Sequence, residues 1–163
     1  MSHVPAISRS SRVVVVGAGA VGCFYGGMLA RQGVDVTLIA RAEHVEAITA
    51  HGLFMNCQTF QAHVPIRATT ELSAAAQADL LLLCVKSPDT ETTGLALSQV
   101  LSPHTVVLNL QNGVDNAPIL QRLLPNPVFP AVVYVATAME GPGRLKHNGR
   151  GELVIGEMNT PGA

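Results

Sequence analysis

The fold of this chain is decided by the stretch Val13-Val-Val-Val16-Gly17-Ala-Gly-Ala-Val-Gly22. Its first four residues are β-branched, which is typical of a strand that is buried on both faces. The glycines that follow have the spacing GxGxxG, and the sequence after them predicts a helix from about Ala20 to Gln32, ended by Gly33. A second strand is predicted over 34–40. The glycines therefore lie between a strand and a helix of a strand–helix–strand unit, which is the position of a dinucleotide-binding turn.

Each glycine of this turn has a different role in binding a diphosphate. The first allows the sharp turn, the second lets the backbone approach a pyrophosphate, and the third lets the helix lie close to the strand. Free N–H groups at the helix start and the positive end of the helix dipole then hold the phosphates. We therefore expect the cofactor to be bound by Gly17, Ala18, Gly19, Ala20, Val21 and Gly22. The alternative is a tight strand-to-helix turn without a ligand.

Two more residues of this helix, Gly26 and Cys23, are interpreted as packing residues rather than as part of a site. Gly26 lies one turn beyond Gly22 and is expected to serve packing only. Cys23 lies in the first helical turn, where a thiolate would be favoured, but we interpret it as a small packed side chain.

The rest of the chain alternates between predicted strands and helices, which indicates an α/β protein. Strands are expected over 80–85, 105–110 and 128–135, and helices over 43–50, 89–100 and 116–124. The stretch 53–67 suggests two short strands, 74–76 a helical turn, 141–143 a turn and 144–155 a terminal hairpin. Because parallel strands need crossover connections, this order predicts a doubly wound, mostly parallel sheet of the Rossmann type.

We divide the chain into a disordered leader (1–10), a dinucleotide-binding domain (11–157) and a last segment (158–163). The last segment is interpreted as the start of an interdomain linker or as a truncated end. No internal repeat is visible.

The composition excludes several classes of protein. The 163 residues carry a net charge of −1, which argues against a nucleic-acid partner or a charged membrane surface. Hydrophobic residues make up 48%, too many for a disordered chain, and 3 cysteines do not make a disulfide framework. We interpret the cysteines as reduced thiols of a cytoplasmic protein. The six histidines are scattered without metal-ligand spacing, so no metal is expected.

The uncharged stretch from Val13 to Ala30 imitates a membrane segment, and Arg9 and Arg12 before it imitate the basic region of a signal peptide. It also contains several glycines, each of which costs about 1 kcal/mol relative to alanine inside a helix. We therefore prefer the strand, turn and helix, and we expect no membrane partner.

The end of the predicted second strand favours NADP(H) over NAD(H). Sites for NAD usually have an Asp or Glu there, which holds the ribose 2′-hydroxyl. Here the strand ends Ala40-Arg41, and an arginine can pair with the 2′-phosphate of NADP. The alternative is a solvated arginine.

Two other polar residues follow predicted strands, at the edge where ligands bind in doubly wound sheets. Lys86 could contact a cofactor phosphate, a ribose or a substrate carboxylate, and Asn112 could hydrogen-bond a ribose or a substrate oxygen. A solvated lysine and a turn-forming Asn-Gly are the alternatives.

Five motifs in order resemble the 2-dehydropantoate 2-reductases, also called ketopantoate reductases. They are Gly17-Ala-Gly-Ala-Val-Gly22, Leu38-Ile-Ala-Arg41, Cys84-Val-Lys86-Ser, Leu110-Gln-Asn112-Gly113 and His147-Asn-Gly149-Arg-Gly151 with Ile155-Gly156. The resemblance implies reduction of 2-dehydropantoate to pantoate with NADPH, a step toward pantothenate and coenzyme A. It also implies that the glycine turn, Arg41 and Lys86 bind the cofactor, and that Asn112 lies between cofactor and substrate.

The chain departs from this family in one respect. Family members continue into a helical second domain, which supplies the lysine that protonates the alkoxide and most substrate contacts. We therefore expect no catalytic residue in this chain, little reductase activity, and a second domain or partner chain; a homo-oligomer is left open. The alternatives are a non-catalytic NADP-binding sensor or interaction module and a related dehydrogenase with another substrate.

Overall fold

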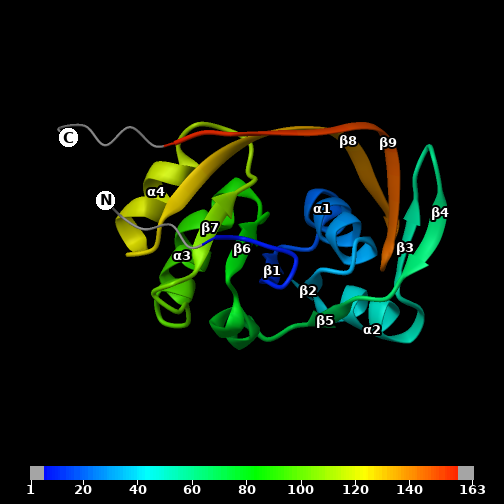
Figure 1. Cartoon of the computed structure of the whole chain (residues 1–163), viewed down its shortest axis with the longest axis horizontal. Coiled ribbons are helices and arrows are strands. Elements are labelled where there is room, and N and C mark those ends of the chain that lie inside the picture. Colours follow the sequence, from blue (N-terminus) through cyan, green and yellow to red (C-terminus); the bar gives the residue numbers. More distant parts are fainter. Residues whose placement is uncertain (1–5, 158–163) are drawn as a thin grey trace.

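The computed structural model describes residues 6–157, which form a nine-stranded sheet with helices on both faces (Figure 1). The predicted last segment, 158–163, lies outside these residues, and so do residues 1–5 of the predicted leader. Residues 6–10 belong to no helix or strand and are exposed.

The central part of the sheet has the strand order of a Rossmann fold, which confirms the predicted fold class. In spatial order its strands are β5 (Arg67–Thr69), β2 (Asp35–Ile39), β1 (Arg12–Val16), β6 (Leu80–Leu83), β7 (Val106–Asn109) and the first part of β8 (Val128–Gly141). All neighbouring pairs in this part are parallel. The order reverses between β1 and β6, so the crevice for a ligand lies beyond the carboxyl ends of these two strands.

The valines of β1 divide between the two faces of the sheet, as a doubly buried strand requires. Val13 and Val15 belong to a core cluster with residues of α1 (Ala20–Arg31). Val14 and Val16 belong to a second cluster, with residues of α3 (Thr90–Ser98), α4 (Asn116–Leu123) and the 3₁₀ helix η1 (Leu72–Gln77). The connection after β2 begins with α2 (Ala42–His51).

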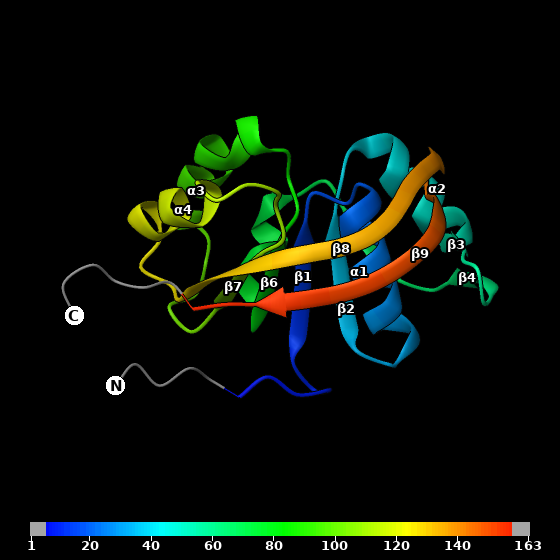
Figure 2. The ribbon, with the colours of Figure 1, turned by 90° about the horizontal axis from the view of Figure 1, so that it is seen from above.

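A mixed part of the sheet, with parallel and antiparallel pairs, covers α1 on the side opposite to β1 and β2. It contains β3 (Leu53–Asn56), β4 (Gln61–Val64), β9 (Arg144–Ile155) and the far part of β8. Figures 1 and 2 show β8 and β9 running side by side across α1. A Cβ at Gly26 would lie 2.8 Å from Leu38 Cδ2, and one at Gly27 would lie 2.6 Å from Met55 Sδ. Gly26 therefore serves packing, as predicted. On the two sides where strands cover α1, these glycines leave no room for a side chain.

Two predictions about the strands are wrong. Residues 144–155 do not form a hairpin of their own; they are the single strand β9, which pairs antiparallel with β8, and β8 continues to Gly141 rather than ending at 135. Gly149 and Gly151 lie within β9 where the register of the β8–β9 pair shifts, as in a β-bulge. The two short strands suggested for residues 53–67 are β3 and β4, and a third strand, β5, follows from Arg67 and forms next to β2.

The predicted helices are confirmed to within two residues at each end. Within residues 6–157, no helix has both the length and the apolar character needed to cross a membrane.

Candidate dinucleotide-binding site

A pocket of about 440 Å³ lies beyond the carboxyl ends of β1, β2 and β6. Three groups of residues that are far apart in the sequence line it. They are Val16 to Gly19 of the glycine turn, Ile39 to Arg41 with His44, and Cys84 to Lys86 with Asp89. The structure therefore brings the glycine turn, Arg41 and Lys86 to one pocket. Asn112 and the helix residues Ala20, Val21 and Gly22 are not part of its lining.

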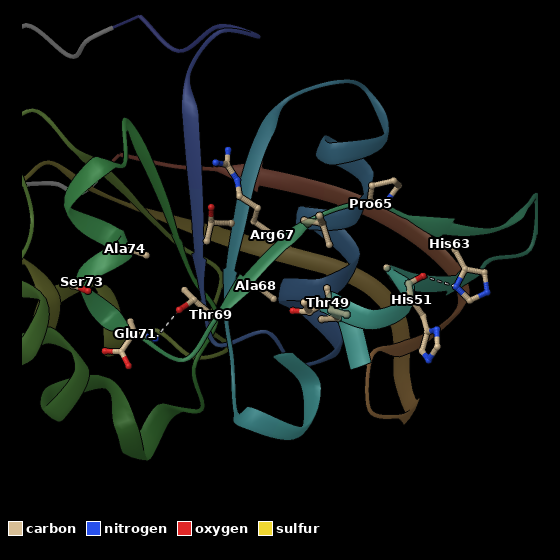
Figure 3. A pocket seen from close by; sticks show the side chains of 14 residues that line it. Thr49, His51, His63, Pro65, Arg67, Ala68, Thr69, Glu71, Ser73 and Ala74 are labelled. Carbon is tan, nitrogen blue, oxygen red and sulfur yellow. Dashed lines mark hydrogen bonds between the residues drawn. The ribbon is translucent and has the colours of Figure 1, made fainter. Parts of the chain in front are cut away.

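A larger groove of about 950 Å³ lies beside β5, between the end of α2 and η1 (Figure 3). Its polar groups bond one another: the Glu71 N–H donates to Thr69 Oγ1 at 3.1 Å, and His63 Nδ1 lies 3.0 Å from the His51 carbonyl oxygen. No residue predicted as a site residue lines this groove.

The glycines of the turn differ in the space around them. A Cβ at Gly17 would lie 2.7 Å from Val85 N, and one at Gly22 would lie 2.5 Å from the Gly17 oxygen. Gly17 also has φ +91°, in the left-handed region that favours glycine. A Cβ at Gly19 would meet no atom within 4 Å. The first and third glycines are thus needed for the turn itself, whereas the second faces open space that a diphosphate could occupy.

The backbone amides of the turn also fall into two groups: those that bond within the protein, and those at the helix start that are available to a ligand. The amides of Gly17 and Ala18 both donate to the Ile39 oxygen at 3.2 Å, and the Gly19 amide donates to the Gly17 oxygen at 2.9 Å. Helix α1 begins at Ala20 without a side-chain cap. The first N–H groups of a helix have no partner within it, so Ala20, Val21 and Gly22 offer the amides for an anion.

Arg41 is the N-cap of α2 and lies at the end of β2. Its side chain is exposed and forms no hydrogen bond or ion pair within residues 6–157. One turn further on, His44 also lines the pocket, and its Nδ1 accepts a hydrogen bond from the Gly143 amide at 3.2 Å. The neutral ring therefore carries its proton on Nε2. Sequence reasoning missed His44, although its spacing of three from Arg41 places both in the first turn of the helix.

Lys86 and Asn112 lie on two neighbouring loops, after β6 and β7, and both side chains are exposed. Lys86 lines the pocket directly. The loops meet through Asn116, whose Nδ2 donates to the Asn112 oxygen at 2.9 Å and to Ser87 Oγ at 3.0 Å. Asp89, the N-cap of α3, also lines the pocket, although the sequence predicts it only as the start of a helix.

Cys23 is a packed side chain, as expected, and not a thiolate. It is fully buried, and its Sγ donates to the Ala18 oxygen at 3.3 Å. Burial raises the pKa of Cys23 to about 12, so the thiol stays protonated in spite of the helix start.

Comparison with known proteins places the chain beside a group of reductases. The sequence model of a family described as "Ketopantoate reductase PanE/ApbA" matches residues 13–160. The 2-dehydropantoate 2-reductase of Pyrococcus horikoshii is 35% identical over 145 residues, which cover 89% of this chain and 47% of that protein. The enzyme of the same name from Lactococcus lactis is 32% identical, over 91% of this chain and 51% of its own length. The chain spans about half the length of the curated relatives it matches.

Solved structures are similar over the same region. A PanE/ApbA family ketopantoate reductase from Ralstonia eutropha is 55% identical, with a TM-score of 0.87, over 88% of this chain and 48% of that one. A D-mandelate dehydrogenase, solved with NADH and anilino(oxo)acetate, is 29% identical, with a TM-score of 0.80. The match covers 88% of this chain and 47% of that one.

Proposed function

The chain belongs to the ketopantoate reductase PanE/ApbA family, and from this premise we propose that it is the NADPH-binding half of a reductase of 2-oxoacids. The first candidate substrate is 2-dehydropantoate, which gives the curated relatives their name. The observation that carries the proposal is the open space over Gly19, in one pocket with Arg41 and Lys86.

The diphosphate of the cofactor would lie over Gly19, at the start of α1. There the amides of Ala20, Val21 and Gly22 supply hydrogen bonds and the positive end of the helix dipole. When bound, NADPH supplies the hydride, and the role of this half is to hold the cofactor in place.

Arg41 would bind the 2′-phosphate that distinguishes NADPH from NADH. No carboxylate stands at the end of β2 to hold a 2′-hydroxyl or to repel a phosphate. The guanidinium has no other partner within the described residues, so it is free to form the paired hydrogen bonds that arginine makes with phosphate. Lys86 would contact a phosphate or ribose, and Asn112 would lie between cofactor and substrate.

The substitution Arg41→Asp tests the cofactor preference. We expect NADPH affinity to fall and NADH affinity to change little, because only NADPH carries the 2′-phosphate. Arg122→Asp is the matched control: it makes the same change of charge on an exposed residue in the last turn of α4. Unchanged NADPH affinity in Arg41→Asp would remove the basis for the preference.

The remaining chemistry needs a held 2-oxo carbon and an acid beside the carbonyl oxygen, and we assign both to a second domain or a partner chain. The outer face of the β8–β9 pair supports this, because it exposes Val132, Tyr134 and Val154, the last at 57%. Exposed apolar side chains that are neighbours on a sheet often mark an interface. We expect this chain alone to bind NADPH without oxidising it when 2-dehydropantoate is added, as followed by absorbance at 340 nm.

A second candidate is a dehydrogenase for another 2-oxoacid. The similarity to a D-mandelate dehydrogenase favours it, because that enzyme shares this half of the fold. NADPH turnover by the chain combined with the proposed second domain or partner chain, on a phenyl-substituted and on a branched aliphatic 2-oxoacid, would distinguish the two substrates.

A further inference from the structure

The loops that follow β6 and β7 are joined by a chain of hydrogen bonds that is centred on buried side chains. Gln111 Nε2 donates to the Val85 oxygen and to Thr90 Oγ1, both at 2.8 Å. Thr90 Oγ1 in turn donates to Asn116 Oδ1 at 3.0 Å. Gln111, Thr90 and Asn116 are all buried. We call these three side chains the inter-loop bridge.

The bridge ends on the backbone beside the two exposed residues of the proposed site. At one end it binds the carbonyl of Val85, the residue before Lys86. At the other end Asn116 Nδ2 donates to the carbonyl of Asn112 itself, at 2.9 Å. The hydroxyl of Ser87, the residue after Lys86, accepts from the same nitrogen at 3.0 Å. The backbone around both site residues is thus tied to one polar chain.

The direction of every hydrogen bond in the bridge is fixed. The Val85 carbonyl can only accept, so the amide nitrogen of Gln111 must face it, and its second hydrogen goes to Thr90. Thr90 then has its own hydrogen for the oxygen of Asn116, which leaves the Asn116 amide to donate to Asn112. Within the bridge, Thr90 is therefore the residue that links Gln111 to Asn116. A second, more exposed link joins the loops through Ser87 Oγ, which accepts from Asn116 Nδ2 at 3.0 Å and donates to the Asn112 oxygen at 3.5 Å.

Apart from these polar contacts, the two loops have little apolar packing to hold them near the pocket. Residues 86–89 and 112–115 are all exposed, so neither site residue is anchored by apolar burial. We propose that the inter-loop bridge is a positioning device, with Thr90 at its centre, that sets Lys86 relative to Asn112 for cofactor binding. The inference rests on the proposed function, because it assumes that these two residues face NADPH.

The test compares Thr90→Val, which keeps the shape of the side chain but loses the hydroxyl, with Thr90→Ser, which keeps the hydroxyl. The matched control is Thr105→Val. Thr105 is 0% exposed and Thr90 1%, and Thr105 Oγ1 donates to the Ala78 oxygen at 2.7 Å at the amino end of β7. Each variant is assayed for its melting temperature and for its NADPH dissociation constant.

We expect Thr90→Val and Thr105→Val both to lower the melting temperature, and Thr90→Val alone to weaken NADPH binding, by about fivefold or more. Thr90→Ser restores the affinity. In a Lys86→Ala background, Thr90→Val has little further effect, because the bridge acts through Lys86. If Thr90→Val does not fold, Asn116→Asp replaces it, since the carboxylate can still accept from Thr90 but cannot donate to Asn112.

Two results separate failure of this inference from failure of the proposed function. NADPH affinity at the wild-type level in a folded bridge variant, or an effect that adds in full to Lys86→Ala, overturns the positioning role alone. Absence of NADPH binding by the unsubstituted chain overturns the proposed function and this inference with it.

Discussion

The substitution Gly19→Ala separates binding from folding at the glycine turn. Gly19 has φ −84° and ψ −157°, a conformation open to alanine, and a Cβ there meets no atom within 4 Å. The free energy of unfolding should therefore change by less than about 0.5 kcal/mol. The methyl group would, however, occupy the space proposed for the diphosphate.

The expected loss of affinity follows from the hydrogen bonds that the methyl group prevents. Pushing the diphosphate away from the helix start removes at least one hydrogen bond to a charged group, which contributes about 1.5–3 kcal/mol. The NADPH dissociation constant should rise by about 10- to 100-fold. The chain has no tryptophan, so the fluorescence of NADPH can be titrated without indole emission.

Gly17→Ala is the matched comparison, because it should act on folding. A Cβ at this position would lie 2.7 Å from Val85 N, and the residue must keep φ +91°. The conformation costs about 1–2 kcal/mol and the overpacking about 1–3 kcal/mol, which urea unfolding followed by circular dichroism would detect. Wild-type NADPH affinity in Gly19→Ala, or a loss of stability there equal to that of Gly17→Ala, would refute the reasoning.

Three further predictions concern single residues. Lys86→Ala should weaken NADPH binding about fivefold without changing the melting temperature, because the side chain is exposed; equal affinity would contradict its role. Leu38→Ala should cost about 2–5 kcal/mol in urea unfolding, because Leu38 is fully buried beneath α1; a cost below about 1 kcal/mol would contradict the packing. Burial raises the pKa of Cys23 from 9.0 to about 12, so its contribution to stability is complete below pH 9 and is lost as pH rises toward 12. Unfolding at pH 8 and pH 10 should therefore show a smaller alkaline loss in Cys23→Ala than in the wild type, by up to about 1.4 kcal/mol per pH unit; equal losses would contradict this.

The parallel half of the fold could be predicted because its signals are local. The valines of β1 are buried on both faces of the sheet, and the glycine spacing after them fits only a strand followed closely by a helix. Strand β6 is similarly a continuous apolar run, and β7 is apolar up to its last residue, Asn109, as expected when helices cover both faces.

The pairing of the other strands, and the edge strand β5, could not be predicted, because contacts between distant parts of the chain define them. Strand β3 lies beside β9, which is about 90 residues away in the sequence, and no local sequence pattern predicts this pairing. Strand β5 has three residues and exists through its pairing with β2. In β9, Gly149 and Gly151 have the composition of a turn but are accommodated in an irregular part of a long strand.

The same distinction applies to the site. Arg41 and Lys86 could be singled out because each follows a strand whose end is visible in the sequence. His44 and the inter-loop bridge could not, since their importance depends on contacts with Gly143 and between two separate loops.

Calorimetric titration of the purified, folded chain with NADPH and then with NADH tests the central claim most directly. The account predicts saturable binding of one NADPH per chain, with weaker binding of NADH. A sample with the circular dichroism of a folded α/β domain that takes up neither dinucleotide would contradict it.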